Sequence, residues 1–298
     1  MRTALILALA FLPAAAQDEP KPEPVDVGAV LAKSKEFLAK CKEFKVEFDR
    51  EKGTVRALGE IAYRGGGPCE YLVNVFPAKS HETIVLLDNG PWAGKGRRPR
   101  GVMNGLATTV NNALLAAGFK KGKAFDWDRE TGDVFPPTGE TVHMYAEFKD
   151  EKGGLVRARL ADWLWNFITV DAMKPGHFVY TGSVMIDEGP PKHKKWFGAE
   201  IDRLLVGILN TQTVLIDNTE EGSLDNGTYE AIPVRIPDLG TRVTVVFSRK
   251  PLEHKVYEPL VLNKAIHEAR KRRAEKLAAK AKEDAEKKKE KKKEKDGE

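Results

Sequence analysis

The sequence predicts an α+β domain with a largely antiparallel sheet, one or two packed helices and a charged C-terminal helix and tail. Two observations support this class. Many short, β-branched or alternating segments lie between glycine, proline and charged turn residues. One segment near the middle of the chain instead has the three-four apolar spacing of a helix face.

The N-terminal part of the domain is expected to begin with an amphipathic helix over residues 26–42, with Phe37 and Leu38 near its apolar face. The turn at residues 51–53 separates two extended segments and predicts a β-hairpin. In chain order, strands are expected over residues 45–49, 54–63, 70–76, 82–87, 141–148, 155–160, 178–186, 196–201, 204–209, 214–216 and 242–247.

Residues 104–118 carry the clearest helix signal in the domain. Leu106, Val110 and Leu114 repeat at intervals of four, and Gly118 stands where a helix commonly ends in a left-handed glycine. We therefore expect this helix to pack its apolar face against the sheet.

The first sixteen residues are typical of a secretory signal peptide. Arg2 precedes the apolar run 4–12, and the small residues 14–16 form a cleavage site. The apolar run is shorter than the roughly 20 residues that cross a bilayer, so no transmembrane span is expected after processing. A proline-rich linker, residues 17–25, follows, and we expect a periplasmic or secreted protein.

The net charge of +5 is concentrated at the C-terminus, because residues 263–298 contain 15 Lys or Arg and 9 Asp or Glu. The domain over residues 26–261 is therefore close to neutral, and no nucleic-acid partner is expected. Residues 262–298 begin as a helix with a thin apolar stripe. From Lys287 onward a Lys-Lys-Lys-Glu repeat aligns like charges four apart, which predicts a frayed, disordered tail.

Cys41 and Cys69 are the only cysteines. Export permits a disulfide between them, and two reduced, partly buried thiols are the alternative. No Cys-x-x-Cys or other metal-ligand spacing is present, so neither a metal nor a cofactor is expected.

Several local phrases, in their order along the chain, resemble the YdjY domain, a family of exported bacterial proteins with no assigned activity. The resemblance spans roughly residues 44–249 and brings no catalytic residues with it. The basic loop near Arg97 and the C-terminal tail are not part of the pattern. The matching phrases are residues 79–83, 114–119, 136–139, 161–163, 178–183, 236–237 and 240–241.

His81 and Glu82 form one candidate binding pair. A metalloprotease helix would need a second histidine at position 85, which is valine, and the segment is β-branched, as in a strand. A partner-binding pair and a structural hydrogen-bonded pair remain as alternatives.

A long basic loop, residues 89–102, is the other candidate site. It lacks the spacing and the Ser or Thr of a phosphate-binding P-loop, which excludes nucleotide hydrolysis by that route. Guanidinium groups beside an indole could hold an anion or a glycan, and a solvated loop is the alternative. The candidate residues are Trp92, Lys95, Arg97, Arg98 and Arg100.

No catalytic constellation is visible: Ser183 lacks a nucleophile elbow, and Asp162 beside Trp163 indicates a core more than a pocket. We expect an exported, non-enzymatic domain that binds an unknown envelope ligand or protein. Its tail would act as an electrostatic tether to anionic envelope polymers or lipids. One alternative is an envelope enzyme, such as a hydrolase, with a pocket near His81 and Glu82. Another is a structural module whose tail helix pairs with a partner helix.

Overall fold

A computed structural model describes residues 26–65, 67–87, 105–128, 130–187, 189, 194–220 and 222–258, with the single residues 275 and 279. The predicted signal peptide 1–16, the linker 17–25, the loop 89–102 and nearly all of the tail 262–298 lie outside these residues. No helix within the described ranges is long and apolar enough to cross a membrane.

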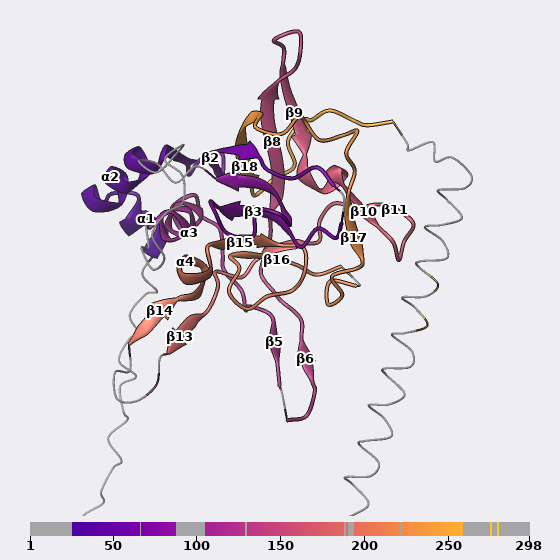
Figure 1. Cartoon of the computed structure of the whole chain (residues 1–298). Helices are drawn as coiled ribbons and strands as arrows, with labels where there is room; N and C mark the ends of the chain where they lie inside the picture. The colour runs from indigo at the N-terminus through magenta and orange to yellow at the C-terminus, as the bar shows by residue number, and fades with distance from the viewer. Residues whose placement is uncertain are drawn as a thin grey trace, which may run out of the picture.

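The fold is mixed α and β and consists mostly of sheet, as the sequence predicts (Figure 1). The main sheet has 11 strands in the order β7-β12-β16-β15-β3-β4-β2-β18-β8-β9, with β1 beside β2. Its strands are β1 Val46–Asp49, β2 Thr54–Ile61, β3 Tyr71–Val75, β4 Thr83–Leu87, β7 Glu140–Thr141, β8 His143–Lys149, β9 Leu155–Arg159, β12 Phe178–Tyr180, β15 Leu204–Gly207, β16 Ile216–Asn218 and β18 Arg242–Ser248.

The pairings in the main sheet are antiparallel except for two, β3 with β4 and β15 with β16. Each parallel pair is joined by a short connection, residues 76–82 in the first and 208–215 in the second. The order is symmetric about the β3–β15 contact: β2 lies against β4 on one side, and β12 lies against β16 on the other. The centre of the sheet therefore contains two similar three-strand units, β12-β16-β15 and β3-β4-β2, that lie side by side.

Three small sheets complete the β structure. A β5–β6 hairpin and a β13–β14 hairpin project from the body, and β10 lies between β11 and β17 (Figure 1). Their bounds are β5 Asp126–Trp127, β6 Val134–Phe135, β10 Leu164–Asn166, β11 Asp171–Ala172, β13 Met185–Asp187, β14 Lys195–Phe197 and β17 Tyr229–Ala231.

The single helix predicted over residues 26–42 is wrong, because two helices occupy this segment: α1 Val27–Leu31 and α2 Lys35–Phe44. The break falls where the Ser34 side chain accepts a hydrogen bond from the backbone N–H of Phe37 and so begins a new helix. Lys45, in a left-handed conformation, ends α2.

The predicted central helix is confirmed as α3 Leu106–Ala116, with Gly118 in a left-handed conformation after its end. Its N-terminus receives the carboxylate of Glu200, which accepts hydrogen bonds from the N–H groups of Gly105 (2.8 Å) and Thr108 (3.0 Å). Glu200 comes from a fourth short helix, α4 Gly198–Asp202. A negative group at this position stabilises the helix.

Strand β2 shows how the two faces of the sheet differ. Its residues alternate between buried and half-buried, so that Val55, Ala57 and Ile61 join the core beneath α3 while Thr54 and Arg56 point to the opposite side. We call this opposite side, over β1, β2, β18, β8 and β9, the outer face. It carries the site described below.

Two predicted strands are corrected. The segment 178–186 is broken by Gly182 and Ser183, both at positive φ, into β12 and the hairpin strand β13. The segment 196–201 ends as a strand at Phe197 and continues as α4.

Candidate functional site

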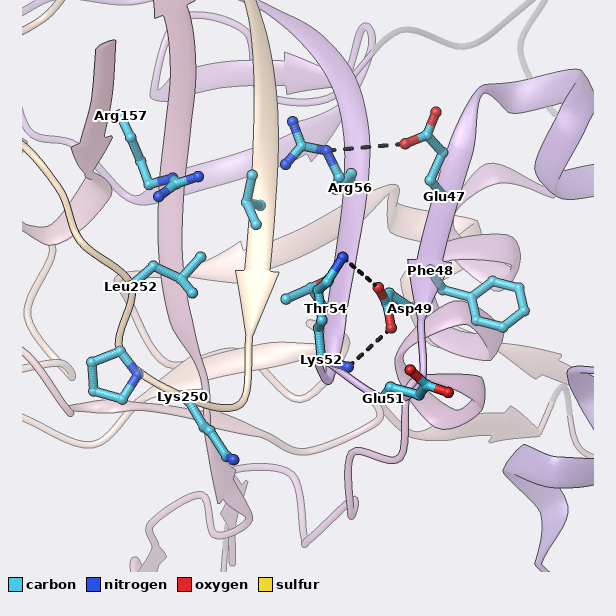
Figure 2. Close-up of a pocket in the computed structure, with 12 residues that line it drawn as sticks. Glu47, Phe48, Asp49, Glu51, Lys52, Thr54, Arg56, Arg157, Lys250 and Leu252 are labelled. Atoms are coloured by element: carbon cyan, nitrogen blue, oxygen red, sulfur yellow. Dashed lines mark hydrogen bonds and ion pairs between the residues drawn. The ribbon is translucent and has the colours of Figure 1, made fainter. Parts of the chain in front are cut away.

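A groove of about 710 Å³ lies on the outer face, between the β1–β2 hairpin and the segment of chain that follows β18. We call it the outer groove, and we call residues 249–258 the strap. Figure 2 shows the acidic side chains of the hairpin on one side and Leu252 and Arg157 on the other. The lining residues are Glu47, Phe48, Asp49, Glu51, Lys52, Thr54, Arg56, Arg157, Val246, Lys250, Pro251 and Leu252.

A buried carboxylate, that of Glu147, lies behind the groove and is bound by both arginines. The antiparallel register of β8 and β9 places Arg157 directly opposite Glu147, and its Nε donates to Oε1 at 2.8 Å. Arg56 binds the other carboxylate oxygen from β2. Burial acts to raise the pKa of Glu147, but the hydrogen bonds from the two arginines outweigh it and hold the pKa below its usual value.

The two arginines are therefore fixed in place while remaining partly open to solvent. The side chain of Glu147 is only 5% exposed, whereas those of Arg56 and Arg157 are 37% and 34% exposed. Each guanidinium has more donors than Glu147 uses. Arg56 Nε lies 4.0 Å from Glu47 Oε2, and Arg157 Nη1 donates to the carbonyl of Glu253. The groove thus holds oriented cationic groups on a rigid sheet.

The two walls of the groove carry opposite charge. The hairpin wall contributes Glu47, Asp49 and Glu51; Asp49 pairs with Lys52 at 3.1 Å, and Glu47 lies 4.0 Å from Arg56 Nε. The strap wall contributes Lys250, which makes no ion pair with any residue that the structure describes. A ligand in the groove therefore meets an acidic wall and a basic wall.

The strap is held against the sheet by hydrogen bonds along its length. Tyr145 Oη accepts from the backbone N–H of Leu252 at 2.8 Å, and the N–H of Lys255 donates to the carbonyl of Arg157 at 2.7 Å. Further along, Trp163 Nε1 donates to the hydroxyl of Tyr257. The basic wall is therefore anchored to the sheet beneath it.

His81 and Glu82 lie elsewhere, at the start of β4, and they do contact each other. His81 Nε2 is 2.9 Å from Glu82 Oε1, and the imidazole is 74% exposed. The parallel register Tyr71↔Thr83 also brings Glu70 beside Glu82. Burial, followed by the hydrogen bond with Glu82, raises the pKa of Glu70. Glu70 was not among the predicted site residues; the only signal for it in the sequence is that Glu70, like Glu82, directly precedes a buried strand.

Asp162 does not join this pair. The loop 89–102, with the candidates Trp92, Lys95, Arg97, Arg98 and Arg100, lies outside the described part of the chain. Asp162 pairs with Arg159 in the turn η2 Leu160–Trp163, beside the buried Trp163. His81, Glu82 and Asp162 therefore form no common pocket.

The disulfide considered between Cys41 and Cys69 does not form. Both thiols are free and buried, Cys41 on α2 and Cys69 before β3, where its Sγ donates to the carbonyl of Tyr71. Burial raises the pKa of Cys41 to about 11, which makes its thiol unreactive at neutral pH.

No group of three or more His, Cys, Asp or Glu side chains among the described residues is placed to hold a metal ion. No family model, curated protein or solved structure matches the chain, so its resemblance to the YdjY domain stays a prediction.

Proposed function

We propose that the chain is an exported, non-enzymatic α+β domain of YdjY type that binds a short peptide segment carrying both charges in its outer groove. The Lys/Glu tail acts as an electrostatic tether to anionic polymers or lipids of the cell envelope. Export rests on the signal-like N-terminus, and the tether rests on the positive charge of residues 263–298.

The observation that supports the peptide ligand is the opposite charge of the two walls. In an extended peptide, successive side chains point to opposite sides, so a lysine can face Glu47 and Glu51 while a neighbouring glutamate faces Lys250. Leu252 offers apolar contact between the walls. The volume of about 710 Å³ lies within the range of sites that hold ligands of this size.

A purely anionic ligand fits less well. Glu147 already neutralises part of the charge of Arg56 and Arg157, and the hairpin wall would repel an anion. Charges on both walls give specificity mainly by excluding the wrong partner.

The test uses the mature chain, residues 17–298, and a fluorescent pentapeptide, Ala-Leu-Lys-Glu-Ala, titrated at low salt; its adjacent Lys and Glu point to opposite sides in an extended conformation. We expect saturable binding that Lys250→Glu weakens by about fivefold, because a charge reversal at the basic wall costs about 1 kcal/mol in partly exposed surroundings. Lys195→Glu, an equal charge change on the β14 hairpin, is the matched control and should leave affinity unchanged. Equal weakening by both variants would exclude the groove as the site.

The tether is tested separately, by co-sedimentation with phosphatidylglycerol vesicles over a salt series. The mature chain should bind and should be released as salt rises, because exposed charges are screened. A chain that ends at Leu262 should remain in solution. Equal retention of both chains would exclude the tether.

One observation favours an enzyme as the second candidate function: Glu70 lies beside Glu82, and burial together with the hydrogen bond to Glu82 raises the pKa of Glu70. Hydrolysis of p-nitrophenyl ester and glycoside substrates, lost in Glu82→Gln and kept in Glu60→Gln, would support it. No hydrolysis of either substrate by the wild-type chain would count against it.

A further inference from the structure

We infer that the Lys/Glu repeat of the tail, residues 286–296, docks in the outer groove of its own chain and competes there with external ligands. This inference rests on the proposed function of the groove. The occupant is thus a segment that follows the strap in the same polypeptide.

The path of the chain allows this contact. Residues 250–252 line the groove, and the strap then runs along β9 to Glu258, about 20 Å further on. Residues 259–298 follow it. Residues 275 and 279 are helical, and a helix over residues 262–285 would be about 36 Å long, which covers the roughly 20 Å back to the groove once the chain reverses after Glu258.

The charge pattern of the repeat matches the two walls. Lys289 and Glu290 are neighbours, as are Lys293 and Glu294. In an extended segment, the two members of such a pair point to opposite sides. The lysines would face Glu47 and Glu51, and the glutamates would face Lys250. The repeat at residues 286–296, whose sequence predicts a frayed tail, would then have a binding role.

A tethered segment competes at an effective concentration of about 1 mM. A contact that is weak in isolation therefore occupies the groove for a substantial fraction of the time and weakens the apparent affinity for a free peptide by about twofold to tenfold. When an anionic surface captures the lysines of the tail, the groove opens. Tethering and ligand binding would then be coupled.

Paramagnetic relaxation in the full mature chain tests the contact without any external ligand. A nitroxide is attached at Lys291→Cys, and the two native thiols do not interfere because both are buried. We expect the label to broaden the amide signals of residues 47–52, Lys250 and Leu252 selectively at low salt. The broadening should disappear at roughly 0.5 M salt, where the Debye length falls to about 4 Å.

Two sets of substitutions leave the tail unchanged: one alters the acidic wall of the groove, and the other is a control outside the groove. In the labelled chain, Glu47→Gln with Glu51→Gln should reduce the broadening at least twofold. Glu36→Gln, on the surface of α2, should not change it. Absent broadening at the groove, or broadening centred elsewhere, would overturn the inference.

The outcome also separates the inference from the proposed function. If the pentapeptide binds and the label shows no contact, the docked tail is wrong and the binding groove stands. If the label shows the contact and no pentapeptide binds even after phosphatidylglycerol vesicles are added, the groove serves the tail alone and the proposed function is wrong.

Discussion

Two buried carboxylates, Glu147 under the outer groove and Asp217 at the other end of the main sheet, are stabilised in different ways. Glu147 is bound by two guanidinium groups that reach the surface. Asp217, in β16, has no exposed surface, and its hydrogen-bond donors among the described residues are all neutral. These are Asn210 Nδ2 at 3.0 Å and the N–H groups of Asn218 at 2.9 Å and Thr211 at 3.4 Å.

The pKa values of the two groups move in opposite directions. The arginines lower the pKa of Glu147 despite its burial, whereas burial raises the pKa of Asp217 to about 7 against the opposing effect of its hydrogen bonds. The difference shows where charge is available for binding. Around Glu147 the compensating charges are partly exposed and can meet a ligand. Around Asp217 the polar groups satisfy one another and hold the connection between β15 and β16.

The largest expected effect is on the pH dependence of stability and concerns Asp217. Because its folded pKa is raised, its contribution to stability is greatest below the unfolded pKa of about 4 and is lost as pH rises to about 7. Asp217→Asn removes this dependence. The free energy of unfolding of the variant relative to wild type should therefore rise by about 2–4 kcal/mol between pH 4 and pH 7. Urea unfolding at both pH values measures it, and a constant difference would contradict the assignment.

The second-largest expected effect concerns Glu147, whose pKa is shifted in the opposite direction to that of Asp217. Its lowered pKa contributes stability above the unfolded value of about 4.3, and this contribution is lost as pH falls. Glu147→Gln should cost about 1–2 kcal/mol at pH 7, limited because the arginines are partly exposed, and the cost should shrink at pH 3. Glu60→Gln, which loses an exposed pair with Arg242 at 3.6 Å, is the control and should cost less than about 0.5 kcal/mol in the same urea titrations.

The smallest expected effect is on the hydrogen bond that attaches the strap to Tyr145. Tyr145→Phe removes the acceptor of the Leu252 N–H and should weaken the local anchoring of the strap by about 1 kcal/mol. Hydrogen exchange of the Leu252 amide should accelerate about fivefold. Tyr63→Phe, which removes a hydrogen bond to the carbonyl of Gly67, should leave that amide unchanged. An unchanged Leu252 in both variants would show that the hydroxyl does not hold the strap.

Elements with a long, regular pattern were predictable from the sequence. The alternation in β2 and the three-four spacing of α3 each repeat over several residues, so local pattern and tertiary packing agree. Strands of two or three residues, such as β5 and β10, are too short to show a period. Their position depends on the partner strand.

The outer groove was not predictable, because its parts come from distant segments. Glu47 and Arg56 belong to one hairpin, but Arg157 and Lys250 reach them only through the order β1-β2-β18-β8-β9. The buried Glu147 also looked like an ordinary charged residue on a strand. In contrast, the pair His81 and Glu82 was found because its members are adjacent in sequence, and its third member, Glu70, was missed for lack of that signal.

Amide chemical-shift mapping of the mature chain with the Ala-Leu-Lys-Glu-Ala peptide tests the binding groove most directly. The account predicts saturable shifts confined to residues 47–56, Lys250 and Leu252. Shifts that cluster around Glu70 and Glu82, or no shifts up to several times the effective concentration of about 1 mM, would contradict it.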